Sequence, residues 1–173
     1  MARMNASDYR RLSARARSRD GGARLRAVDH LCVLAVACAY ALMLAWLLFT
    51  GDVRFWLVLL GPASGFLALS ALRRALDRPR PYEVLDIEPL LDAHKKRGSF
   101  PSRHVFSSAL IAVALAPVQP LAAAGIGILT ALIAWIRVVG GVHWPQDVIA
   151  GACLGMLWGL ASYGVALVCG LPL

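Results

Sequence analysis

The sequence predicts an all-α protein, an integral membrane helical bundle of about five transmembrane helices. Its N-terminal residues can also form a helix at the membrane interface. Two observations carry this prediction. Hydrophobic residues make up 59% of the 173 residues, and the mean hydropathy is +0.64, whereas soluble domains contain roughly 45–50% apolar residues. The apolar residues also form long runs, as expected of a protein dissolved in lipid. The length favours a single domain.

Five apolar segments are candidate membrane spans. Four of them have the roughly 17–25 residues that a helix needs to cross the hydrocarbon. The third reaches a spanning length only if its helix begins near Ser102. A Gly61-Pro62 pair is expected to kink the second. The segments are Val28–Thr50, Val53–Leu72, Val105–Ala116, Leu121–Val139 and Val148–Cys169.

Glycines repeat every four residues along the fifth segment, at Gly151, Gly155 and Gly159. On a helix this spacing leaves one face without side chains. Such a face allows another helix to approach closely.

A basic arm over residues 1–27 precedes a membrane-embedded domain over 28–173. The arm holds eight arginines and two acids. Residues Tyr9 to Arg19 favour either a weakly amphipathic helix on the membrane surface or a disordered basic tail. The first apolar run is about 20 residues long, which exceeds a signal-peptide core, so it is interpreted as a retained span.

Positive charge is concentrated in two places. Of the 18 basic residues, eight lie in the arm, eight lie between Arg73 and Arg103, and the other two are Arg54 and Arg137. Such clusters suit anionic lipid head groups and phosphates. Nucleic acid is excluded as a partner because no nucleic-acid module accompanies the charge. The four cysteines lie in apolar runs without CxxC or Cys/His spacing, so no zinc site or disulfide framework is expected.

The 73–103 segment is too polar to cross a membrane and too long for a simple turn, which indicates a functional loop. Two spans separate it from the basic arm, so both lie on one side. The positive-inside rule then places the arm and the loop in the cytoplasm. The sequence carries no signal for an oligomeric state.

Three polar clusters lie at span ends on this same face. The first is Arg73 with Arg80-Pro81, where the second span ends. The second runs from Pro101 to His104, where the third begins. The third lies between the last two spans and contains Arg137, His143 and Asp147. Ionisable groups beside membrane spans are costly and seldom idle, so the three clusters are predicted to form one site.

The residue types suit phosphate chemistry. Arginine forks bind phosphate oxygens in a bidentate manner, and the free N–H groups of a helix that opens at Ser102 also favour an anion. Asp147, four residues after His143, can reach back to one imidazole nitrogen while the other attacks phosphorus. His104, from another helix, can protonate the leaving oxygen. No metal or other cofactor is expected.

At these residues the chain resembles the type-2 phosphatidic acid phosphatase superfamily, also called lipid phosphate phosphatases, over about residues 55–168. The family motifs Lys-x6-Arg-Pro, Pro-Ser-Gly-His and Ser-Arg-x5-His-x3-Asp are matched in order. Here they read Arg73-x6-Arg80-Pro81, then Pro101-Ser102-Arg103-His104, then Ile136-Arg137-x5-His143-x3-Asp147. The resemblance implies a helical bundle, a phosphohistidine on His143, His104 as general acid and no metal. It also implies phosphate binding by Arg73, Arg80, Ser102 and Arg137.

Three positions depart from the family pattern. Arg73 replaces a lysine, Ile136 replaces a serine, and Arg103 replaces a glycine. The side chain of Arg103 is therefore expected either to reshape the pocket or to add a contact to the phosphate-bearing substrate. Many bacterial members also have six spans, and on the count of five this chain is expected to lack the first.

The sequence leaves several functions open. The leading one is a lipid phosphate monoesterase or diphosphatase. A phosphotransferase would use the same residues, and a catalytically silent lipid-binding protein would be expected to lose one of the two histidines. Vanadium haloperoxidases share a similar constellation but are soluble. Phosphatidic acid, phosphatidylglycerol phosphate, polyprenyl diphosphates and polyprenyl-linked sugar phosphates all remain candidate substrates.

Overall fold

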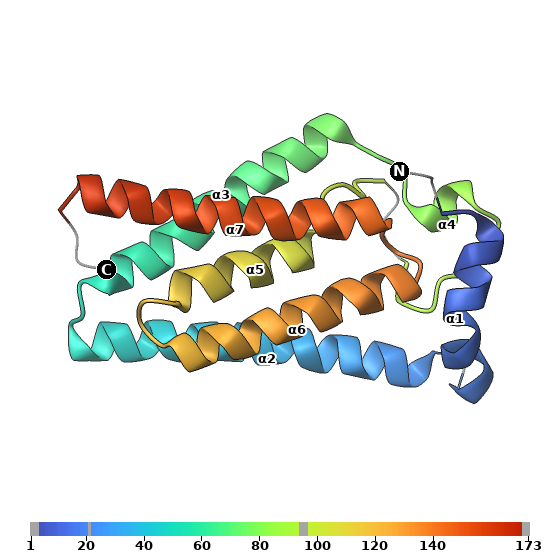
Figure 1. Ribbon diagram of the computed structural model, residues 1–173, viewed down its shortest axis with the longest axis horizontal. Coiled ribbons are helices and arrows are strands. Elements are labelled where there is room, and N and C mark those ends of the chain that lie inside the picture. Colours follow the sequence, from blue (N-terminus) through green and yellow to red (C-terminus); the bar gives the residue numbers. More distant parts are fainter. Residues whose placement is uncertain (1–3, 21, 94–96, 171–173) are drawn as a thin grey trace.

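The computed structural model describes residues 4–20, 22–93 and 97–170. Five helices lie side by side along one axis, and two others lie at one end (Figure 1). No strand occurs in the described residues, which confirms the all-α prediction. Arg3 of the predicted arm lies outside the described residues. The helices are α1 (Ala6–Asp20), α2 (Ala23–Thr50), α3 (Arg54–Leu76), α4 (Pro81–Val84), α5 (Arg103–Leu115), α6 (Pro120–Val139) and α7 (Pro145–Val168).

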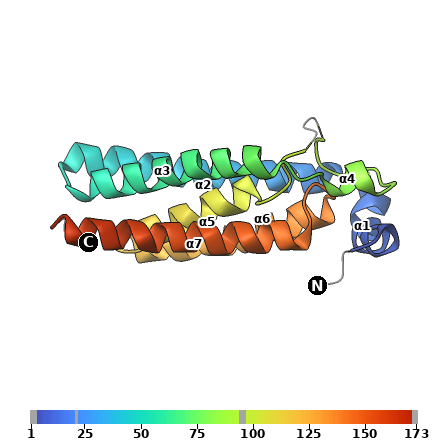
Figure 2. The same cartoon turned by 90° about the horizontal axis from the view of Figure 1, so that it is seen from above.

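Four of these helices, α2, α3, α6 and α7, are long and apolar enough to cross a membrane. They form two layers, α2 with α3 and α6 with α7 (Figure 2). Many of their large apolar side chains point outward, among them Phe49, Leu121 and Val168. In water this would be unfavourable, but in a bilayer these surfaces face lipid tails. The helix α3 continues through Pro62.

The central helix is α5, which contacts α3, α6 and α7. Its 13 residues span only about 20 Å at 1.5 Å per residue, less than the hydrocarbon thickness of about 30 Å. The residues just before it are packed inside the protein, since Ser99 and Ser102 are completely buried. The third apolar segment is therefore a short helix that begins inside the bundle.

The glycine-rich face of α7 packs directly on α5. A Cβ atom at Gly151 would lie 2.8 Å from the carbonyl oxygen of Ser102, and one at Gly155 would overlap the carbonyl oxygen of Phe106. At Gly159 it would lie 2.7 Å from a methyl group of Val113. These distances confirm the close approach predicted from the four-residue repeat.

The N-terminal arm is ordered over its described part. Helix α1 lies across the end of the bundle (Figure 1). Of the two alternatives for the arm, a helix and a disordered tail, the structure therefore shows a helix. Its Arg17 pairs with Glu88 at 2.9 Å, and Arg10 donates to the carbonyl of Asp86 at 3.0 Å. Tyr9 is 1% exposed and packs against Gly141. The helix thus packs on the protein, and α2 already begins at Ala23, inside the predicted arm.

Candidate active site

The predicted nucleophile lies in the turn between α6 and α7. Helix α6 ends at Val139 and α7 begins with Pro145 in its first turn, as expected from the sequence. The backbone N–H groups of Val142 and His143 donate to the carbonyl of Arg137 at 3.3 and 3.2 Å. Gly141 adopts a φ of +76°, which suits glycine because it has no Cβ. The turn holds His143 at 2% exposure.

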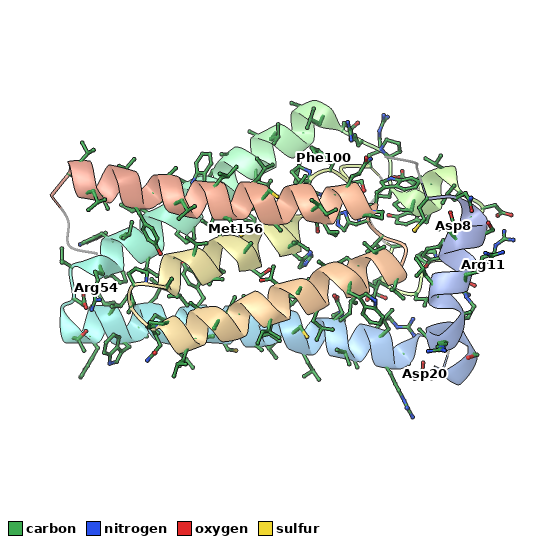
Figure 3. All side chains as sticks on the ribbon, in the orientation of Figure 1. Asp8, Arg11, Asp20, Arg54, Phe100 and Met156 are labelled. Carbon is green, nitrogen blue, oxygen red and sulfur yellow. The ribbon has the colours of Figure 1, made fainter. Side chains whose placement is uncertain are left out.

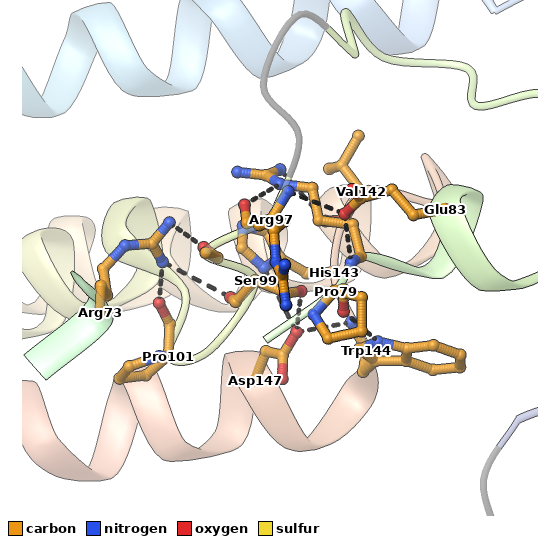
Figure 4. Close-up of polar contacts among 12 residues, drawn as sticks. Arg73, Pro79, Glu83, Arg97, Ser99, Pro101, Val142, His143, Trp144 and Asp147 are labelled. Carbon is orange, nitrogen blue, oxygen red and sulfur yellow. Dashed lines mark hydrogen bonds and ion pairs between the residues drawn. The ribbon is translucent and has the colours of Figure 1, made fainter. Parts of the chain in front are cut away.

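Asp147 lies beneath this histidine on the first turn of α7. Its Oδ2 is 3.5 Å from Nδ1 of His143, which is within ion-pair distance, and Nδ1 has no hydrogen-bond partner among the described residues. The same oxygen accepts the Trp144 backbone N–H at 3.1 Å and the Ser99 hydroxyl (Figure 4). Asp147 is completely buried. These donors hold the carboxylate in a position from which it can fix the Nδ1–H tautomer of the imidazole.

The start of α5 joins the same site. Ser102 precedes the first residue of the helix, and its backbone N–H donates to the carbonyl of Asp147 at 2.9 Å. Its buried hydroxyl oxygen has no hydrogen-bond partner among the described residues. The helix therefore opens where the sequence predicted, with its N–H groups beside the His143 turn. His104 follows in the first turn of α5.

The first motif contributes two arginines that contact backbone carbonyls. Arg73 is buried and donates to the carbonyls of Gly98 and Pro101 (Figure 4). Arg80 donates from Nε to the carbonyl of Arg97 at 3.2 Å and from NH1 to that of Val142 at 3.3 Å. Both side chains thus brace the loops around the nucleophile. A guanidinium has five N–H donors, so each can serve a carbonyl and an anion together.

Arg137 makes a contact that the sequence did not predict. Its NH2 lies 2.8 Å from Oδ2 of Asp29, which is on α2 and only 3% exposed. Both residues line a cavity of about 390 Å³ that also contains His104. Further lining residues are Arg26, His30, Val33, Leu34, Ala37, Leu91 and Asp92. The predicted acid and one predicted phosphate ligand therefore face one space.

Arg103, which replaces the glycine of the family motif, points toward α3. Its guanidinium carbon lies 5.2 Å from the centre of the Phe66 ring, in a cation–π contact. Both side chains line a cavity of about 220 Å³ that His104 also borders. Arg103 thus forms part of the wall beside the predicted acid.

The environment of His143 favours its neutral, nucleophilic form. Burial lowers the pKa of the His143 imidazole to about 4, and the positive charges of Arg80 and Arg73 act in the same direction. The Asp147 carboxylate opposes this shift. Above pH 5 the ring therefore keeps a free nitrogen lone pair. Because the pKa in the folded state lies below the ordinary 6.5, acidification below 6.5 favours the unfolded chain.

This shift predicts an unusual pH dependence. Nucleophilic attack on an aryl phosphate with a good leaving group should persist on acidification until the pH approaches about 4. Arg80→Gln removes a charge that disfavours imidazolium, so the acid limb should move toward 6.5. The measurement is kcat/KM as a function of pH for both proteins. The ratio of the two kcat/KM values at each pH removes the contribution of substrate ionisation, which is the same for both proteins. Coincident acid limbs near 6.5 in both proteins would contradict the assignment.

Three contributing residues gave no signal in the sequence. Ser99 donates to Asp147, Asp29 pairs with Arg137, and Tyr9 packs on the turn at Gly141. Each lies far from its partner along the chain, and none belongs to a motif. Among the described residues, no group of three or more His, Cys, Asp or Glu side chains is placed to hold a metal ion.

Comparison with known proteins gives a family match. The model of the PAP2 superfamily matches residues 54–168, which contain all three predicted motifs. The matched region begins with α3, so α1 and α2 lie outside it.

Two curated proteins are similar to the chain in sequence. The chain is 32% identical over 151 residues to a lipid A 1-phosphatase of Rhizobium johnstonii, covering 84% of this chain and 59% of that protein. It is 39% identical over 77 residues to an undecaprenyl-diphosphatase of Sulfolobus acidocaldarius, covering 44% of this chain and 37% of that protein. The chain thus spans about three fifths or less of the length of these relatives.

Two crystal structures share the fold at 23% identity. One is Aquifex aeolicus LpxE, with a TM-score of 0.68 and coverage of 92% of this chain and 94% of that chain. The other is a transmembrane PAP2-type phosphatidylglycerolphosphate phosphatase of Bacillus subtilis, with a TM-score of 0.55 and coverage of 92% of each chain.

Proposed function

The chain belongs to the PAP2 superfamily, and we propose that it is a multi-pass membrane phosphatase that removes a phosphate group from a lipid phosphate. One observation carries the proposal. The buried His143 and Asp147 lie 3.5 Å apart, and the Ser102 backbone N–H joins Asp147 to the opening of α5, which carries His104. This arrangement supplies an oriented nucleophile and an acid from a different helix.

The proposed reaction has two halves. In the first, Nε2 of His143 attacks phosphorus, the bond from phosphorus to the lipid oxygen breaks, and protonated His104 gives its proton to that oxygen. In the second, His104 takes a proton from water as the water oxygen attacks phosphorus. The nitrogen–phosphorus bond then breaks and inorganic phosphate leaves. Asp147 keeps the Nδ1 proton of His143 in place and stabilises the imidazolium.

The non-bridging oxygens of phosphate require donors. We assign this role to Arg73, Arg80 and Arg137, to Ser102, and to the first N–H groups of α5. The unpartnered Ser102 hydroxyl and the unpartnered Nε of Arg137 support this assignment. Arg103 extends the positive surface beside His104 and is proposed to contact the same head group. These groups neutralise phosphate without a metal ion.

The proposed substrate is a lipid, because both cavities that His104 borders are lined in part by apolar residues of α2, a helix able to span a membrane. The named relatives act on lipid A and on an undecaprenyl diphosphate. We therefore keep four classes in the test: phosphatidic acid, phosphatidylglycerol phosphate, polyprenyl diphosphates and lipid-linked sugar phosphates.

Release of inorganic phosphate by the purified, detergent-solubilised protein from each class tests the function. At least one class should be hydrolysed, with vanadate as an inhibitor, since vanadate mimics five-coordinate phosphorus. A chelator should leave the rate unchanged. Absence of release from every class, or strict dependence on magnesium, would contradict the proposal. Transfer of phosphate to a second lipid without release would indicate a phosphotransferase.

The sidedness of the site is a separate prediction. We propose that the arm, the 73–103 loop and the active site face the cytoplasm, because the arm holds eight arginines and two acids. Exposed Asp86 follows α4 and exposed Gln119 immediately precedes α6, and α4 and the start of α6 lie at opposite ends of the bundle (Figure 1). In a background without the four native cysteines, an impermeant maleimide added to intact cells should label Asp86→Cys poorly and Gln119→Cys strongly. The reverse pattern would place the site outside.

A further inference from the structure

An acidic residue is buried near the start of the first long helix. Asp29 of α2 is only 3% exposed and lies where the polar start of the helix, which contains Arg26 and His30, passes into its apolar part. A buried carboxylate is costly unless a cation and hydrogen bonds compensate it. Asp29 also lies before the region that matches the family model, so none of the three motifs accounts for it.

The cation that compensates Asp29 is Arg137. Its NH2 lies 2.8 Å from Oδ2 of Asp29, and the side chains are 13% and 4% exposed. The backbone carbonyl of Arg137 accepts the N–H groups of Val142 and His143. Arg137 therefore has two attachments, its side chain to α2 and its backbone to the nucleophile turn.

The pair faces the cavity that His104 borders. Asp29 accepts a hydrogen bond from one terminal nitrogen of the Arg137 guanidinium. The Nε of Arg137 has no hydrogen-bond partner among the described residues. A planar guanidinium anchored at one terminal nitrogen has its other donors restricted to a limited range of directions. A second acid of the cavity wall, Asp92, is half exposed and lies 3.9 Å from His30. Asp29 is thus the buried anion that contacts Arg137.

We propose that Asp29 is a positioning residue that aims Arg137 at the substrate phosphate. This inference rests on the proposed function, because it assumes that Arg137 binds phosphate. Asp29 acts through Arg137 and does not touch the reacting atoms. It also links α2, which lies outside the family match, to the active site.

The test compares Asp29→Ala and Asp29→Asn with Asp52→Asn. Asp52 pairs with Arg54 at 2.6 Å, at the end of the bundle opposite α1 (Figure 3), so it controls for loss of an ion pair as such. Asp29→Ala should lower kcat/KM and weaken vanadate binding by about 10- to 100-fold. Asp29→Asn keeps an oxygen acceptor and should recover part of the loss. Asp52→Asn should leave both quantities within about twofold, as expected for sites far apart.

A double substitution separates a positioning role from a structural one. If Asp29 acts through Arg137, adding Asp29→Ala to Arg137→Ala should cost no further activity. An equal loss in both backgrounds would overturn the proposal, as would a lowered melting temperature with unchanged kcat/KM and vanadate affinity. Vanadate and phosphate binding, measured by calorimetry, need no turnover. The effect of Asp29→Ala on vanadate and phosphate binding can therefore be interpreted even if the wild-type protein hydrolyses none of the tested lipids.

Discussion

Replacement of His143 by glutamine is expected to abolish phosphate release. Glutamine can fill the buried site but cannot form a phosphohistidine, so the first half of the reaction has no nucleophile. Losses on removing a catalytic nucleophile reach about 10⁴-fold or more in other hydrolases. The measurement is phosphate release under saturating lipid, together with incorporation of labelled phosphate into the denatured protein. Turnover within tenfold of wild type would refute the mechanism.

A matched histidine controls for this substitution. His30 lies on α2, lines the same cavity as His104, and is exposed. His30→Gln should therefore retain most of the activity. Both variants should elute as single species in detergent with wild-type melting temperatures. If His143→Gln fails this folding check, His143→Asn serves as the alternative.

Replacement of His104 by alanine is expected to produce a loss that depends on the leaving group. A lipid alcohol is a poor leaving group and needs the proton of His104. Phosphate transfer from the lipid phosphate to His143 should therefore slow by about 10²–10⁴-fold. The phenolate of an aryl phosphate with an acidic phenol leaves without that proton. This substrate should therefore react with the variant nearly as fast as with the wild-type protein. The measurement is the rate of phosphoenzyme formation from both substrates in a single turnover.

Equal losses for both substrates would remove His104 from the acid role and indicate a role in binding. Ser108 provides a control substitution on the same helix, since it is buried, donates to the carbonyl of Val105 and lies about one turn further along α5. Ser108→Ala should change neither rate by more than a few-fold.

The fold was predictable because lipid imposes simple rules on sequence. Long apolar runs form helices where the backbone must satisfy its own hydrogen bonds. Helices α6 and α7 begin and end within a few residues of the predicted spans. Pro101-Ser102 before α5 and Pro145 in α7 marked helix starts correctly. The three motif clusters do meet at one end of the bundle.

The partners of the charged side chains were not predictable. A motif names residue types at fixed spacing, whereas a contact such as Asp29–Arg137 depends on how helices 108 residues apart come together. Arg73 illustrates the same limit. The sequence indicated a phosphate ligand, and the structure shows a guanidinium that also holds the loop carbonyls of Gly98 and Pro101. Ser99 could not be distinguished from any other loop serine before the loop conformation was known.

The glycine face of α7 has a mechanical consequence. At Gly151 and Gly155, α7 meets the backbone of α5 with no intervening side chain, so the helix that carries His104 and the helix that carries Asp147 are joined rigidly. Thicker or thinner bilayers exert their force on lipid-exposed surfaces, and helices respond by tilting. Neither α2 nor α3 takes part in these two contacts. The spacing between His104 and Asp147 is therefore set by a contact inside the protein and not by the thickness of the surrounding membrane.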